Sequence, residues 1–202
     1  MRVWMKLTRE QFDVLKSIGK LTADQARQVQ DREDEAAYHW IAEELEKSVS
    51  RPEECRYPVT VWYQAEGKKF VKGIRRSPEE ATEVLVTLEI PEQELKLFDG
   101  NLFRYVEKGQ YIPFNEMDKK RYEQVLQRLN LEDDAESLQE AAKKRRQDSV
   151  AECLRRMVTD SWYWIFDTRR EDDFLFGSNS KKTIQAALWQ VRLDQVKRVE
   201  YL

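Results

Sequence analysis

Residue types that build common active sites are scarce in this chain of 202 residues. It has two cysteines, Cys55 and Cys153, which lie far apart without metal-ligand spacing, and its single histidine is His39. A zinc site usually draws on several Cys or His ligands, so we expect no metal. Only six glycines are present, and no two have the spacing of a phosphate-binding loop. The composition therefore excludes nucleotide-dependent enzymes that carry a glycine fingerprint.

Long apolar runs are missing as well. No stretch approaches the ~20 apolar residues of a membrane-spanning helix. Residues 1–9 lack the apolar core of a signal peptide. Two unpaired thiols suit a reducing compartment. We expect a cytoplasmic protein that does not contact a membrane.

The residues that are present indicate a folded protein with a mixed surface. Hydrophobic residues make up 41% of the chain and aromatic residues 11%, which is enough for a core. Charged residues reach 36% but nearly balance, with a net charge of −3. Such a surface creates no overall field that would attract nucleic acid or acidic lipid.

Two segments share one pattern, a strand followed by one helical turn and a second strand. They are Glu83–Asp99 and Thr183–Leu202. Residues 59–64 alternate and are rich in β-forming residues, which predicts another strand. Thr8 and Gln11 have capping-box spacing, which predicts the start of a helix.

Further helices are expected around these strands, over residues 22–48, 118–129 and 135–159. Residues 99–101 are interpreted as a turn. The order of helices, strands, helices and strands predicts an α+β fold. We expect a single domain, residues 1–202, with a small twisted, mainly antiparallel sheet, N-terminal helices and a central helical insertion over residues 118–160.

Four blocks of the sequence, read together, resemble a known family. They are Ala37–Ile41, Tyr57–Gln64, Ser161–Asp167 and Ile184–Trp189. Their order and spacing resemble a bacterial family, domain of unknown function 3841, over nearly the whole chain. The resemblance implies no particular activity.

The chain departs from that family pattern at two places. Residues 69–75 stand where the family tends towards Lys-x-Asp-Leu-Arg. Phe103 and Arg104 stand where the family tends towards a Trp-His pair. If those polar positions serve a reaction, this chain has altered it.

A weaker resemblance, of topology only, is to ADP-ribosyltransferase-like folds. It implies that NAD would bind in a cleft between two small sheets, with Arg2 near a phosphate and Gln185 on the strand that carries a glutamate in such enzymes. Glutamine can donate or accept a hydrogen bond but cannot supply the negative charge that stabilises a ribosyl cation. His39, between Tyr38 and Trp40 on an expected helix, is interpreted as a helix-surface residue rather than a catalytic base.

The aromatic segment 161–167 is a candidate binding surface. Its aromatic side chains cannot all point inward from one strand or helix face. Aromatic residues beside arginines have the composition of an interface hot spot. The candidate surface consists of Trp162, Trp164, Phe166, Arg169 and Arg170. The alternative is that a bend lets both sides of the segment pack inside the protein.

A basic cluster is the third candidate site. Its residues are Lys143, Lys144, Arg145 and Arg146. A basic stripe on a helix can neutralise phosphates. Acidic residues interleave with this one, so a solvated, salt-bridged helix is the favoured interpretation.

The sequence is therefore interpreted as a cytosolic bacterial or phage accessory protein that acts by binding another protein, without a cofactor. The alternative is an NAD-dependent ADP-ribosyltransferase-like enzyme with an altered acidic residue. A second alternative is a weak nucleic-acid binder. Whether the chain is an enzyme is left open.

Overall fold

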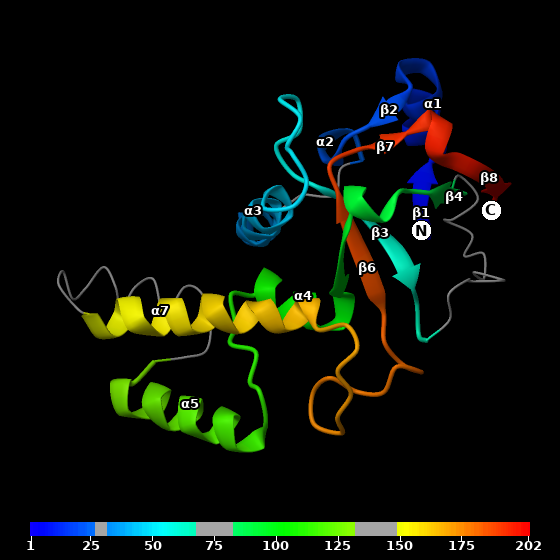
Figure 1. Cartoon of the computed structure of the whole chain (residues 1–202). Helices are drawn as coiled ribbons and strands as arrows, with labels where there is room; N and C mark the ends of the chain where they lie inside the picture. The colour runs from blue at the N-terminus through cyan, green and yellow to red at the C-terminus, as the bar shows by residue number, and fades with distance from the viewer. Residues whose placement is uncertain (27–31, 68–82, 132–148) are drawn as a thin grey trace. The chain divides into compact units, whose positions relative to one another are not determined.

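The computed structural model describes residues 1–26, 32–67, 83–131 and 149–202, and its chain divides into two compact units (Figure 1). The first, the sheet unit, comprises residues 1–98 and 180–202. The second, the helical unit, comprises residues 99–179 and is inserted between the two parts of the first. This unit extends beyond the expected insertion of 118–160 at both ends.

The sheet unit is built on a sheet of six strands. In spatial order the strands are β5 (Lys96–Asp99), β6 (Ile184–Leu188), β3 (Val59–Gln64), β1 (Arg2–Thr8), β4 (Glu83–Glu89) and β8 (Val196–Tyr201). The pairs β1–β3, β1–β4, β3–β6 and β4–β8 are antiparallel. This sheet, together with the helices, confirms the expected α+β class. One face of β1 is apolar and buried through Val3, Met5 and Leu7.

The two strand–turn–strand segments are confirmed, and each crosses the sheet. The first runs from β4 through η2 (Glu92–Glu94) to β5, the strand at the opposite edge. The second runs from β6 through β7 (Val191–Arg192) and η4 (Leu193–Gln195) to β8 at the other edge. Their turns meet, because Glu94 Oε2 accepts hydrogen bonds from Arg192 Nη1 at 3.0 Å and from Gln195 Nε2 at 3.1 Å.

The expected capping box at Thr8 and Gln11 is also confirmed, at the start of α1 (Arg9–Ile18). This helix ends at Gly19, whose φ of 82° is a left-handed conformation that glycine adopts easily. The next residues form β2 (Lys20–Leu21), which pairs with β7 and was not expected. The predicted helix over 22–48 is observed as α2 (Ala23–Ala26) and α3 (Arg32–Glu46).

A buried ion pair attaches α3 to the edge strand β5. Glu44 is only 3% exposed, and its Oε2 lies 3.3 Å from Lys96 Nζ. The same ammonium donates a hydrogen bond of 3.0 Å to the backbone carbonyl of Glu44. A buried carboxylate is tolerated because these contacts replace its lost hydration.

The helical unit contains α4 (Gly100–Glu107), α5 (Glu116–Leu129), α7 (Ser149–Ser161) and η3 (Trp162–Phe166). The expected turn at 99–101 is wrong. Asp99 is instead the N-cap of α4, and its carboxylate accepts hydrogen bonds from the N–H groups of Asn101 and Leu102. Phe103 and Arg104 lie within this helix.

The core of the helical unit is contributed by all of these segments. Its most buried apolar side chains include Leu102, Ile112, Leu126, Leu154 and Ile165. Ser161 connects the end of α7 to the loop between α4 and α5, because its hydroxyl accepts a hydrogen bond from the Ile112 N–H at 2.9 Å and donates one to the Val158 carbonyl. The first part of the expected helix 135–159 and residues 69–75 lie outside the described residues.

Candidate functional site: a groove beside Arg170 and its aromatic cluster

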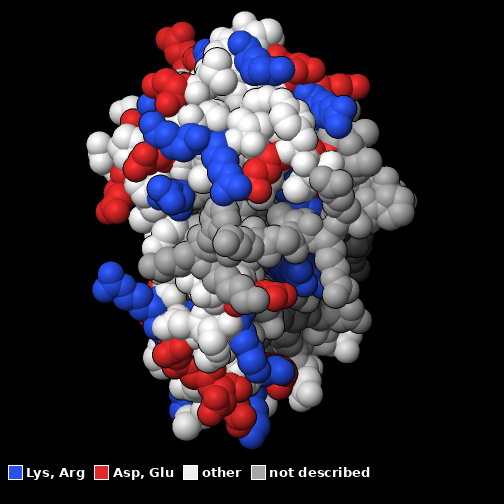
Figure 2. Space-filling view, turned by 90° about the vertical axis from the view of Figure 1, so that its right-hand side faces the viewer, with Lys and Arg blue, Asp and Glu red and all other residues white. Residues whose placement is uncertain are grey.

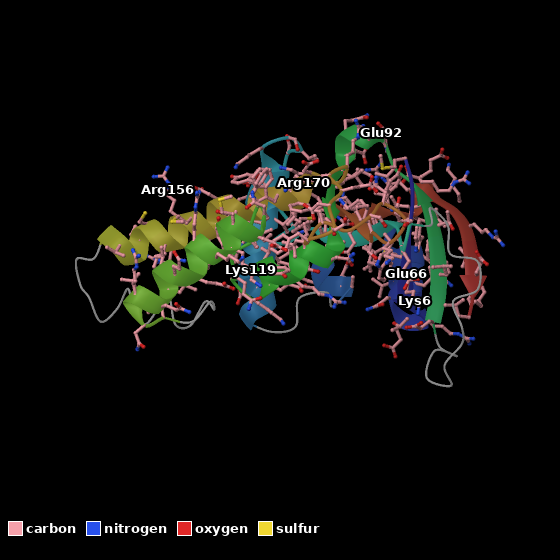
Figure 3. All side chains as sticks on the ribbon, turned by 90° about the horizontal axis from the view of Figure 1, so that it is seen from below. Lys6, Glu66, Glu92, Lys119, Arg156 and Arg170 are labelled. Atoms are coloured by element: carbon pink, nitrogen blue, oxygen red, sulfur yellow. The ribbon has the colours of Figure 1, made fainter. Side chains whose placement is uncertain are left out.

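Arg170 is the centre of an aromatic cluster in the helical unit. Its guanidinium carbon lies 3.9 Å from the centroid of the Phe114 ring, 4.0 Å from that of Phe176 and 5.4 Å from that of Trp164. Its Nη2 donates a hydrogen bond of 2.5 Å to the Phe114 carbonyl and lies 3.4 Å from Asp172 Oδ2. The side chain is 17% exposed. In Figure 3 Arg170 lies among packed side chains, whereas Arg156 projects away from α7.

Asp172 organises the loop that follows. One of its carboxylate oxygens accepts hydrogen bonds from the backbone N–H groups of Phe174, Leu175 and Phe176, at 2.9–3.1 Å. Burial alone would raise the pKa of Asp172. The three N–H donors and the Arg170 charge outweigh burial and lower this pKa below its ordinary value. The carboxylate is therefore ionised at neutral pH and fixes the loop around Phe174.

The segment before α5 is held in a similar way. Asn115 caps the helix by accepting a hydrogen bond from the Asp118 N–H at 2.9 Å. The Asp118 carboxylate accepts hydrogen bonds from the Tyr111 hydroxyl and the Phe114 N–H, both at 2.8 Å. Burial, and then this bond to Asp118, raises the pKa of Tyr111. The backbone that presents Phe114 is therefore fixed before any ligand binds.

Between these two fixed segments lies an open groove with a volume of ≈ 770 Å³. Residues from the start of α5 and from the 170–174 loop line it: Asn115, Glu116, Met117, Lys120, Arg170, Asp172, Asp173 and Phe174. Met117 is 61% exposed, and Phe114, next to the lining residues, is 42% exposed. Large apolar side chains this exposed are what a binding surface requires.

The charges of the groove are mixed. Arg170 and Asp172 neutralise one another, which leaves the carboxylates of Glu116 and Asp173 and the ammonium of Lys120 facing solvent. The groove therefore has a small excess of negative charge. On the face of the molecule drawn in Figure 2, basic and acidic side chains are also intermingled.

The residues predicted for an aromatic binding surface separate into two groups. Trp162 is 9% exposed, and its Nε1 donates a hydrogen bond of 2.8 Å to the Gln110 carbonyl, so it belongs to the core. Trp164 and Phe166 are half-buried and Arg169 is exposed. Trp164 contacts Phe114, with ring centroids 4.8 Å apart.

The sequence did not indicate Phe114, Met117 or Phe174 as site residues. Phe114 and Met117 flank the Asn115 cap, and an exposed apolar pair at a helix start was the available signal. Tyr163, which is 45% exposed, was recognised as part of the aromatic segment but not chosen.

The two residues considered for NAD lie on one face of the sheet. Arg2 alternates with Trp4 on β1, Trp4 is in register with Trp62 on β3, and Trp62 is in register with Gln185 on β6. Residues in register across antiparallel strands, and every second residue along a strand, share a face. Strand spacings place Arg2 and Gln185 about 12 Å apart.

His39 is exposed on α3 and contacts a buried tyrosine. Its Nε2 lies 3.2 Å from the Tyr57 hydroxyl, which also donates a hydrogen bond of 2.7 Å to Glu35. Burial, and then the bond to Glu35, raises the pKa of Tyr57 to about 12. The hydroxyl is therefore protonated at neutral pH, and its bond to Glu35 ties α3 to the segment before β3.

The basic cluster of Lys143, Lys144, Arg145 and Arg146 lies outside the described residues. Farther along, Arg155 and Arg156 contact the carboxylates of Glu152 and Asp160. Within the described residues no group of three or more His, Cys, Asp or Glu side chains is placed to hold a metal ion.

None of the helices in the described part is both long and apolar enough to cross a membrane. No curated protein and no solved structure matches the chain. The sequence model of one family matches residues 2–197, nearly the whole length. The chain therefore belongs to the family described as Domain of unknown function (DUF3841).

Proposed function

We propose that this protein acts by binding another protein, and that the partner docks in the groove between α5 and the 170–174 loop. The observation that carries this proposal is the exposure of Met117 and Phe114 beside a groove whose two walls are already fixed by Asp118, Arg170 and Asp172. Binding to a pre-formed surface avoids much of the entropy cost of ordering loops.

The chemistry of the groove defines the partner segment. An apolar side chain of the partner would contact Met117 and Phe174, where it loses water contact. A lysine or arginine next to it would pair with Glu116 or Asp173, because these two carboxylates outnumber the one ammonium, that of Lys120, which faces solvent in the groove lining. The free thiols Cys55 and Cys153 support a reducing setting such as the cytoplasm for this activity.

Selection from a random displayed-peptide library tests this proposal. We expect peptides enriched on the wild-type protein to combine a large apolar residue with an adjacent Lys or Arg. Met117→Ser should weaken their binding roughly 10-fold or more. Met157→Ser on α7 is the matched control, because Met157 is an exposed methionine outside the groove lining, and it should leave binding unchanged.

Two results would count against the proposal. One is the absence of any enriched peptide motif. The other is equal binding of the enriched peptides to wild type and Met117→Ser, with thermal unfolding showing that both variants are folded.

The common face of Arg2 and Gln185 supports a second candidate, an NAD-using transferase on the sheet. Trp4 and Trp62 lie between them in the register. Millimolar NAD should then raise the thermal unfolding temperature of the wild type and not that of Arg2→Ala. If NAD leaves the wild-type temperature unchanged, this candidate is rejected.

A further inference from the structure

The strand β8 ends the sheet, and within the described residues no other strand pairs with its outer edge (Figure 1). It is six residues long, and Lys197, Arg198 and Tyr201 are exposed on it. An open edge of this length presents unpaired backbone groups to any strand that fits it. The side chains along the edge decide which strands fit.

The pairing of β8 with β4 determines which backbone groups point outward. The Leu202 N–H donates a hydrogen bond of 3.1 Å to the Glu83 carbonyl, so Leu202 faces β4. Residues of an antiparallel strand alternate between bonding one neighbour and the other. Glu200 and Arg198 therefore also bond towards β4, and the N–H and C=O groups of Val199 and Tyr201 point to the open edge.

We propose that this edge binds a second copy of the chain, with the two β8 strands antiparallel and Val199 on the two-fold axis. In this register the two Val199 residues exchange a pair of backbone hydrogen bonds. Arg198 of each copy stands directly opposite Glu200 of the other, so the dimer contains two cross-strand ion pairs.

Charge selects this register over its neighbours. Centring the pair on Arg198 would place two arginines opposite one another, and centring it on Glu200 would place two glutamates opposite one another. Like charges directly opposite in a sheet are unfavourable, whereas opposite charges are favourable. Of these three registers, only the one centred on Val199 places Arg198 and Glu200 each opposite a residue of opposite charge. Such self-complementarity is what a two-fold interface requires.

The same alternation disfavours other strands. Within one chain Arg198 Nε lies 3.3 Å from Glu200 Oε1, so both charges are already side by side at the edge. A strand that places a like charge opposite Arg198 or Glu200 would be repelled, which protects the edge from unrelated chains. Tyr201, which is 57% exposed, adds apolar contact at each end, opposite Lys197 of the second copy.

Sedimentation velocity of the full chain over a range of concentrations tests the proposal. We expect a reversible monomer–dimer equilibrium for the wild type. Arg198→Glu and Glu200→Arg should each weaken it roughly 10-fold or more, because each places like charges opposite one another. The double variant R198E/E200R reverses both charges and should dimerise like the wild type.

Mixing the two single variants gives the sharpest result. A chain with glutamate at both positions is complementary to a chain with arginine at both, so the mixture should form heterodimers although each variant alone is monomeric. Arg156→Glu, a charge reversal on the exposed face of α7, is the control and should not change the equilibrium.

Val199→Pro offers an independent test of the strand edge. Proline removes the outward N–H without removing a bond to β4, and prolines are tolerated on edge strands in this orientation. A wild type that stays monomeric at every concentration, or a dimer that survives both single charge reversals, would overturn the proposal. Circular dichroism identifies any variant that fails to fold. If a single variant fails to fold, the double variant R198E/E200R still tests the proposal.

Discussion

The contacts that stabilise the sheet unit internally differ in kind from those that stabilise the helical unit. In the sheet unit, strand ladders and pairs such as Glu44–Lys96 join segments far apart in the sequence. In the helical unit, single carboxylates such as Asp118 and Asp172 each bind several nearby groups, and Arg170 stacks between rings. Stability in the sheet unit is therefore spread over many residues, whereas a single substitution in the helical unit should reshape the groove.

The largest effect is expected from the core of the sheet unit. Leu88 on β4 is fully buried, so Leu88→Ala should lower the free energy of unfolding by about 2–5 kcal/mol, through lost burial and the cavity left behind. Urea denaturation measures this change. Glu89→Ala, an exposed neighbour on the same strand, should change it by less than about 0.5 kcal/mol. Equal effects of the two variants would contradict the buried position of Leu88.

Arg170 tests the helical unit. Arg170→Ala should cost about 2 kcal/mol, because stacking on two rings and the bond to the Phe114 carbonyl are lost together. Hydrogen exchange at the Phe174–Phe176 amides should accelerate in this variant. Arg170→Lys should recover little, since an ammonium lacks the planar face that stacks on rings. Arg169→Ala is the exposed control, and a comparable loss of stability there would refute the stabilising role of the Arg170 contacts.

The stability that Asp172 gives to the same loop should be lost at acidic pH. Because the pKa of Asp172 is lowered in the folded state, its contribution to stability is complete above its ordinary pKa and is lost as pH falls through the folded value. Asp172→Asn should cost about 1 kcal/mol at neutral pH, and the difference from wild type should shrink below about pH 4. Chemical denaturation at several pH values measures it, with Asp173→Asn as the control. A difference that persists unchanged in acid would contradict this account.

The stability of the sheet unit should show the opposite pH dependence, which arises at Tyr57. Its folded pKa of about 12 lies above the ordinary value of 10.0, so its contribution is complete below pH 10 and is lost as pH rises towards 12. Tyr57→Phe should cost about 1 kcal/mol at neutral pH. Above pH 10 the wild type should lose stability faster than Tyr57→Phe in the same denaturation assay. Parallel curves would show that the hydroxyl does not titrate as proposed.

The sheet unit was largely predictable from the sequence because alternation and β-branched residues identify long strands without knowledge of their neighbours. The order in which the strands pair was not predictable, since β4 and β5 are close in sequence but stand four positions apart in the sheet. Two-residue strands such as β2 are too short to leave a pattern. Asp99 was misinterpreted because aspartate favours turns and helix caps alike.

The helical unit was less predictable. In η3 the side chains repeat about every three residues, so Trp162 and Ile165 point inward while Tyr163 and Phe166 lie together on the other side. Neither a strand nor an α-helix pattern gives that division. The groove itself joins residues near 115 with residues near 172, and no local pattern in the sequence indicates a contact between segments so far apart.

The crossing of the two strand–turn–strand segments also has a consequence for biosynthesis. Both β6, which stands between β5 and β3, and the edge strand β8 come from residues 184–201, after the whole helical unit. A ribosome therefore releases β1, β3, β4 and β5 long before the strand that joins β5 to β3 exists. We expect the nascent sheet to remain incomplete until residues 184–201 leave the exit tunnel, so chains that stop near residue 179 expose strand edges and depend on chaperones.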